Sequence, residues 1–152
     1  MTNWFGVKAS YDKTMENGTQ KKVTELYLVD ALSWTEAEAR AIEELRPYIA
    51  GEFTIADISR YPLAELFFNE NGDRYFKAKI FFVTLDERSG TEKKTPANIL
   101  VQACDLQEAK DVLTKGMEGT MADWELPKIE ETKIMDVFPH SSEVKLTKEK
   151  EV

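Results

Sequence analysis

Six lysines recur in pairs along the chain and could hold the phosphates of a nucleic acid. The two members of each pair are 71 or 72 residues apart, and the six are Lys8, Lys21, Lys22, Lys79, Lys93 and Lys94. Aromatic residues lie among them, and exposed rings stack on the bases of a single strand while lysines follow its phosphates. The rings that could do this are Trp4, Tyr11, Tyr27, Tyr75 and Phe82. The combination predicts a surface for single-stranded nucleic acid.

The distribution of charge supports this prediction only locally. The whole chain carries a net charge of −8, which is a poor match for a protein that binds phosphate backbones. Residues 4–29 nevertheless carry +1 and residues 75–101 carry +2, so the rest of the chain carries −11. An alternative interpretation is that the rings form the core and the lysines are solvated strand edges that oppose aggregation.

Protein binding is a second functional hypothesis. Acidic helix faces can dock a basic partner, and an exposed sheet edge can accept an added strand. Binding of this kind should depend on the helix acids. Nucleic-acid binding should depend on the lysines and weaken steeply with salt.

No enzymatic chemistry can be assigned. The chain has one cysteine, Cys104, and one histidine, His140, so zinc-site spacing and an internal disulfide are both excluded. Cys104 precedes a predicted helix, whose dipole could lower a thiol pKa, but the equivalent residue of the repeat is Leu32. Because an apolar residue occupies the equivalent position, we expect the Cys104 side chain to be buried among apolar residues and its thiol to be unreactive. Phosphate loops, nucleotide fingerprints and Ser/His/Asp arrangements are absent, so we expect no enzyme activity, cofactor or metal.

The elements that must position these residues form a tandem repeat. Residues 4–45 recur, with changes, at residues 75–117. The identical pairs are Phe5/Phe76, Lys8/Lys79, Gly18/Gly90, Thr19/Thr91, Lys21/Lys93, Lys22/Lys94, Leu28/Leu100, Val29/Val101, Ala31/Ala103, Glu36/Glu108 and Ala37/Ala109. We interpret the repeat as a tandem duplication.

Each repeat predicts a hairpin, a helix and further strand. Alternating apolar residues predict strands at 4–11 and 21–31 in the first copy, and at 75–85 and 93–103 in the second. A capping box marks each helix start, Ser33 with Glu36 and Asp105 with Glu108. Strand-like segments follow each helix at 53–58, 63–68 and 124–138.

These elements predict an α+β protein, a duplicated β-hairpin/helix/strand unit with two helices on largely antiparallel sheet. The predicted units are 1–72 and 73–139, related by a pseudo-twofold axis and sharing one core because about 70 residues bury little surface alone. Whether they form one sheet or two stays open, as does the oligomeric state. Residues 140–152 are predicted to be a flexible charged tail. No signal peptide or membrane span is evident, so we expect a cytoplasmic protein with no membrane partner.

Several segments together resemble an uncharacterised family, the domain of unknown function 4494. They are KKVTELYLVDALSWTEAEARAIEEL, GEFTIADI, EKKT, ILVQACDLQEA, GMEGTMADWE and ETKIMDVFP. The resemblance covers residues 3–139. It implies a small intracellular protein of Bacteroidetes or their phages and mobile elements, with no assigned activity and no catalytic residues to carry over.

Overall fold

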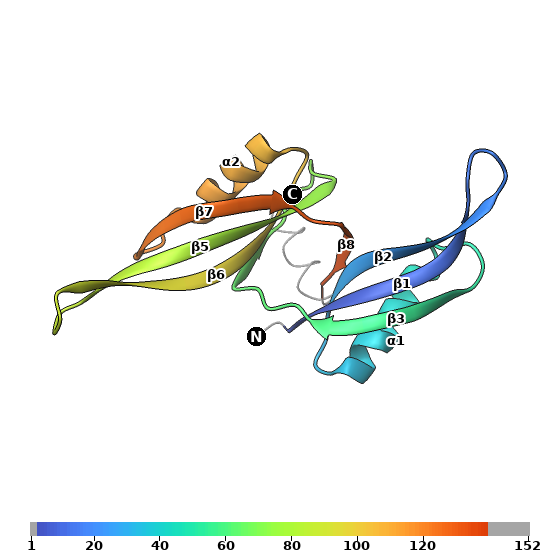
Figure 1. Ribbon diagram of the computed structural model, residues 1–152, viewed down its shortest axis with the longest axis horizontal. Helices are drawn as coiled ribbons and strands as arrows, with labels where there is room; N and C mark the ends of the chain where they lie inside the picture. Colours follow the sequence, from blue (N-terminus) through green and yellow to red (C-terminus); the bar gives the residue numbers. More distant parts are fainter. Residues whose placement is uncertain (1–2, 140–152) are drawn as a thin grey trace, which may run out of the picture. The chain divides into compact units, whose positions relative to one another are not determined.

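The computed structural model describes residues 3–139, which form two compact units (Figure 1). The first unit contains the chain up to Pro62 and again from Lys133, and the second contains Leu63–Thr132. The predicted tail, residues 140–152, lies outside the described residues.

The first unit is a four-stranded sheet with one helix. Its strands are β1 (Trp4–Thr14), β2 (Gln20–Asp30), β3 (Phe53–Arg60) and β8 (Ile134–Phe138), and its helix is α1 (Trp34–Leu45). The strand order is β3-β1-β2-β8, with β8 parallel to β2 and the other pairs antiparallel.

The second unit repeats this plan. It contains β4 (Glu65–Phe67), β5 (Arg74–Asp86), β6 (Thr91–Ala103), α2 (Leu106–Gly116) and β7 (Asp123–Glu131). Its order is β4-β6-β5-β7, with β4 parallel to β6. The α+β class and the duplication are confirmed, and the sheets are two separate four-stranded mixed sheets.

The two repeats exchange their last strands. Strand β4 comes from the first repeat but pairs with β6 of the second, and β8 comes from the second repeat but pairs with β2 of the first. The compact units therefore differ from the sequence-defined units 1–72 and 73–139. Each compact unit has a core cluster of its own.

The predicted helix starts and hairpin turns form by local chemistry. The Ser33 hydroxyl accepts a hydrogen bond from the Glu36 backbone N–H at 3.2 Å, and the Asp105 carboxylate accepts one from that of Glu108 at 2.8 Å. These bonds satisfy backbone donors that a helix start leaves without partners. The hairpin glycines Gly18 and Gly90 have φ of 85° and 70°, which side chains with a Cβ rarely adopt.

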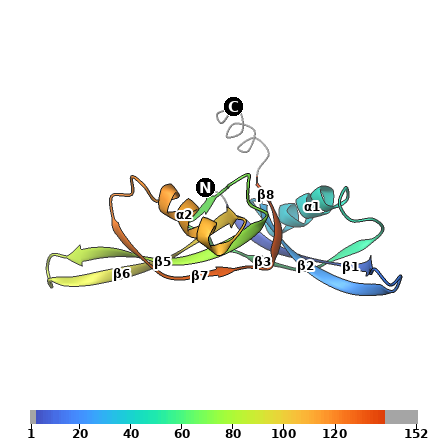
Figure 2. The ribbon, with the colours of Figure 1, turned by 90° about the horizontal axis from the view of Figure 1, so that it is seen from above.

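Each helix packs on one face of its own sheet (Figure 2). In the first unit, Val7 and Val29 contact the α1 side chains in one core cluster. In the second unit, Phe76, Ala78 and Ile80 point to α2 in the same way. Side chains at alternating positions point to the opposite face of each sheet, which we call the helix-free face.

The outer strands β3 and β7 carry bulges at equivalent places. The register of β3 on β1 skips Ala56, and the register of β7 on β5 places Leu126 and Pro127 opposite one residue. Ala56 and Pro127 are 71 residues apart, so the bulge belongs to the duplicated plan. Bulges, and a proline without an N–H, protect an edge from adding another strand.

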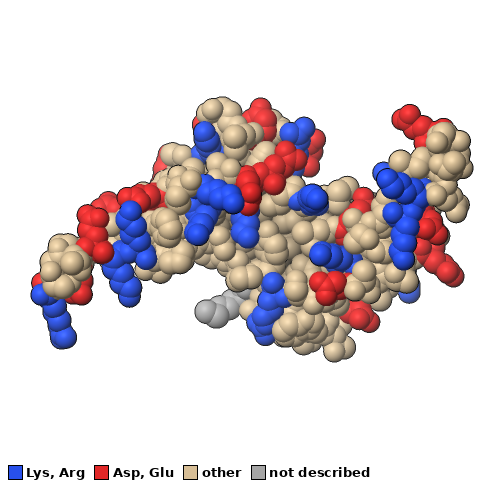
Figure 3. Space-filling model, in the orientation of Figure 1, with Lys and Arg blue, Asp and Glu red and all other residues tan. Residues whose placement is uncertain are grey.

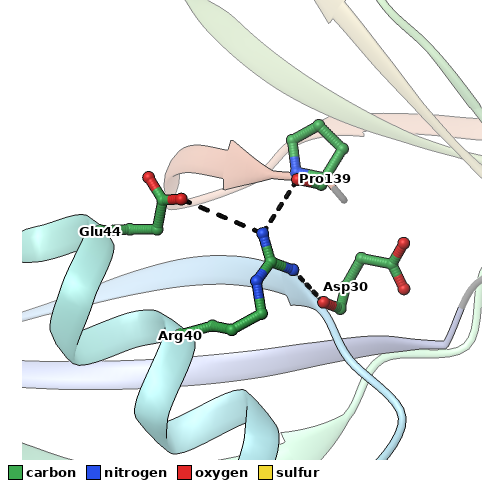
Figure 4. Close-up of polar contacts among 4 residues, drawn as sticks. All are labelled: Asp30, Arg40, Glu44 and Pro139. Atoms are coloured by element: carbon green, nitrogen blue, oxygen red, sulfur yellow. Dashed lines mark hydrogen bonds and ion pairs between the residues drawn. The ribbon is translucent and has the colours of Figure 1, made fainter. Parts of the chain in front are cut away.

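Arg40 of α1 connects the end of β8 to the rest of the first unit through hydrogen bonds (Figure 4). Its guanidinium donates to the backbone carbonyl of Pro139 at 3.0 Å and to that of Asp30, and lies 4.0 Å from the Glu44 carboxylate. The Arg40 side chain is only 17% exposed. It therefore joins the helix, the end of β2 and the end of the exchanged strand.

We expect Arg40→Ala to lower the free energy of unfolding by about 2 kcal/mol, because it removes hydrogen bonds from a charged donor to two carbonyls. Amide hydrogen exchange should become faster in β8 before it does in β1. Glu44→Ala is the control, and should change stability by less than about 0.5 kcal/mol because that ion pair is long and exposed to solvent. Unchanged protection of β8 in Arg40→Ala would contradict the role of Arg40.

Candidate nucleic-acid interface

The six predicted lysines do not share one face. Consecutive residues of a strand point to opposite faces of the sheet. The two adjacent lysines of each doublet, Lys21 with Lys22 and Lys93 with Lys94, therefore lie on opposite faces. In the first sheet, Lys8 and Lys22 lie on the helix-free face, and Lys21, opposite Lys13, lies on the other. In the second sheet, Lys79 and Lys94 lie on the helix-free face, and Lys93, opposite Thr84, does not.

The predicted rings are not available to stack on bases. Trp4, Tyr27 and Tyr75 are buried, with exposed fractions of 8%, 8% and 4%. Tyr11 and Phe82 are partly buried against the cores of their units, on the helix side. The expectation that these rings stack on bases beside the lysines is therefore wrong. Tyr11, Tyr27 and Phe82 pack in or against the helix-side cores. Trp4 and Tyr75 lie on the helix-free faces by strand alternation but are themselves buried.

A different set of residues gathers on the helix-free face of the second sheet. Lys77, Lys79 and Phe81 alternate along β5 with the buried residues, and the register places Lys128 of β7 opposite Lys79. A shallow depression of about 440 Å³ lies here. Its lining includes Lys77, Lys79, Lys128, Asn98, Pro96 and Glu130. In Figure 3, lysine and arginine side chains lie over the middle of β5 and β7.

The electrostatics of this depression favour an anion. Lys79 and Lys128 are directly opposite each other on neighbouring strands, and like charges in this position destabilise a sheet. Glu130, 3.5 Å from the Lys128 ammonium, offsets part of the repulsion. The Lys79 ammonium also lies 5.6 Å from the centre of the Phe81 ring. A bound phosphate would relieve the remaining repulsion.

Sequence reasoning missed Lys77, Phe81, Asn98 and Lys128. Strand alternation was a usable signal for two of them, because burial of Phe76, Ala78 and Ile80 requires Lys77 and Phe81 to point outward. Lys128 has no such signal, since its place opposite Lys79 depends on the bulge in β7.

Cys104 is exposed, and so is its equivalent Leu32, at 80%. The predicted burial of the Cys104 side chain is therefore wrong. The pKa of the Cys104 thiol is raised, chiefly by its hydrogen bond with the Glu108 carboxylate. This carboxylate opposes the effect of the helix dipole, so the thiol stays protonated at neutral pH.

Two tyrosines of the first unit share one carboxylate. The Tyr27 hydroxyl donates to Glu25 at 3.1 Å. Burial, followed by the charge of Glu25, raises the pKa of Tyr27, and burial, followed by a hydrogen bond with Glu25, raises the pKa of Tyr11. Both hydroxyls therefore stay protonated at neutral pH.

The described part of the chain contains neither a metal-ligand cluster nor a membrane-spanning helix. No group of three or more His, Cys, Asp and Glu side chains is arranged to hold a metal ion there. Within residues 3–139, no helix is long and apolar enough to cross a membrane. His140 lies outside the described residues.

Comparison with known proteins identifies a family without an assigned activity. The family described as Domain of unknown function (DUF4494) matches residues 3–140. The chain belongs to this family. No curated protein matches its sequence.

Proposed function

We propose that this member of the domain of unknown function 4494 family is a non-enzymatic protein that binds single-stranded nucleic acid on the helix-free face of its second sheet. The observation that carries the proposal is the depression lined by three lysines, Lys77, Lys79 and Lys128, and by one acid, Glu130. The proposal includes a cytoplasmic location and the phage or mobile-element origin that the family resemblance implies.

The depression has the groups that such a ligand requires. The lysines of β5 and β7 hold successive phosphates, and the partly exposed Phe81 ring next to them offers a face for one base. Asn98, whose amide both donates and accepts hydrogen bonds, lies opposite Lys79 on β6. Three phosphate contacts on a single strand correspond to a slope of about −2 in log K against log salt.

Fluorescence anisotropy with a labelled single-stranded oligonucleotide, at several salt concentrations, tests the proposal. Lys79→Glu should weaken binding about tenfold or more and make the salt slope shallower, because one phosphate contact is lost and a negative charge is added. The fold should remain intact, since the change replaces a like-charge pair with an opposite-charge pair across β5 and β7.

Lys93→Glu is the matched control for this experiment. It makes the same change on the same hairpin, at an exposed position of the opposite face. Its binding should stay within about twofold of the original protein, because Lys93 does not face the depression. Absence of binding at low salt, or equal losses in the two variants, would refute this interface.

Docking of a basic protein partner on α1 is the second candidate. Leu32 is 80% and Trp34 46% exposed at the start of this helix. The helix carries four glutamates and Arg40, with no basic residue in its last turn. The bulges in β3 and β7 disfavour an added strand at these two edges. A partner bound here would be lost in Trp34→Ala and retained in Lys79→Glu.

A further inference from the structure

A second depression lies beside the outer strand β7 of the second sheet, toward the tip of the β5–β6 hairpin. It measures about 560 Å³, and its lining includes three carboxylates, those of Glu92, Asp123 and Glu125, together with Val83, Thr120, Ala122 and Trp124. The register places Asp123 opposite Val83 and Glu125 opposite Phe81, so both carboxylates share the face of Lys79. This depression is acidic, whereas its neighbour is basic.

The two depressions divide the face into halves of equal and opposite charge. The basic half has three lysines and Glu130, a net of +2. The acidic half has three carboxylates and Lys94, a net of −2, and Lys94 pairs with Glu125 at 3.0 Å. Along the strands, Lys128 and Asp123 lie on opposite sides of the position of Phe81, each about 7 Å away at roughly 3.3 Å per residue.

We propose that a second copy of this chain docks on this face, related by a twofold axis through Phe81. Such an axis places the basic half of each copy on the acidic half of the other, with Lys128 opposite Asp123 of the second copy. A twofold interface must be complementary to itself, and a face with a positive and a negative half meets this condition. Phe81 and its cross-strand neighbour Pro96 supply apolar surface at the centre.

The charge pattern of this face favours a second copy of the chain over other binding partners. A polyanion long enough to span both halves would be repelled by the acidic half, and only a short segment of one would fit on the lysines; a basic peptide of the same length would be repelled by the lysines. The required partner has the same two charges in reversed order, which the second copy provides. Pairing through the β7 edge, next to this face, is disfavoured by its bulge and by Pro127. The second copy would cover the lysines that the nucleic acid requires, so we expect the dimer and the nucleic-acid complex to exclude each other.

Sedimentation velocity over a range of protein concentrations at low salt tests the interface. The original protein should form a dimer that dissociates as salt is raised. Lys128→Glu and Asp123→Lys should each weaken dimerisation about tenfold or more, because each places like charges opposite one another at two symmetric positions. An equimolar mixture of the two variants should regain the dimer, since Glu at 128 then faces Lys at 123 and the remaining pair is unchanged.

Lys93→Glu, on the opposite face, is the control and should dimerise like the original protein. A monomer at every concentration, a dimer insensitive to both variants, or a mixture that fails to recover would each overturn the proposal. The nucleic-acid proposal is assessed separately with Asp123→Lys, which leaves Lys77, Lys79 and Lys128 in place and should retain oligonucleotide binding while losing the dimer.

Discussion

Replacing Gly72 with alanine should lower the free energy of unfolding by about 3 kcal/mol or more, among the largest effects of any small substitution in this chain. A Cβ at Gly72 would lie 2.5 Å from both the backbone nitrogen and the Cα of Ala103. Backbone atoms cannot rotate away as a side chain can, so the turn itself must move. Urea denaturation measures the change.

Gly18→Ala is the control for this prediction. Gly18 also lies in a turn, but no atom lies within 4 Å of a Cβ built there, and its φ of 85° is the only obstacle. The expected cost is about 1 kcal/mol. Equal costs in the two variants would show that the close approach to Ala103 does not matter.

The Gly72 turn also affects the candidate interface. It leads directly into β5, whose first pair on β6 is Arg74 with Ala103. A displacement of β5 along β6 by one residue would turn Lys77 and Lys79 toward the helix side. The alanine variant should therefore lose oligonucleotide binding together with stability.

Leu113→Ala should be the second large effect, with a loss of about 2 to 5 kcal/mol in the free energy of unfolding. Leu113 is fully buried between α2 and its sheet. The first repeat has Ala41 at the equivalent position, so the change removes side-chain volume that only the second unit contains. Thermal and urea denaturation, followed by circular dichroism, measure the loss.

Leu106→Ala is the matched control, because it makes the same change on the same helix at a residue that is 47% exposed. Its cost should be below about 0.5 kcal/mol. Amide exchange in Leu113→Ala should accelerate across β5 and β6, and also in β4, because β4 pairs with β6 although it belongs to the first repeat. Acceleration confined to the second repeat would contradict the strand exchange.

The candidate interface shows how far the lysine pattern could be used. Lys79 was predicted and lies in the basic depression, and Lys94 lies on the same face beside Glu125. Lys21 and Lys93 were predicted because they recur as an identical pair next to Lys22 and Lys94, but strand geometry turns adjacent residues to opposite faces. Trp4 and Tyr75 were predicted as exposed rings, but both are buried, because a ring at a strand position packs wherever apolar surface meets it.

The sequence by itself determined the features that depend on residues close together in the chain. These are the repeated order of elements, the hairpin turns at Gly18 and Gly90, and the helix starts at Ser33 and Asp105. These depend on hydrogen bonds and backbone angles within a few residues. Only the tertiary structure decided the exchange of β4 and β8, the division into two sheets, and the place of Lys128 opposite Lys79. Each of these is a pairing between distant segments, selected by the burial of whole strands and by a bulge whose register no local pattern specifies.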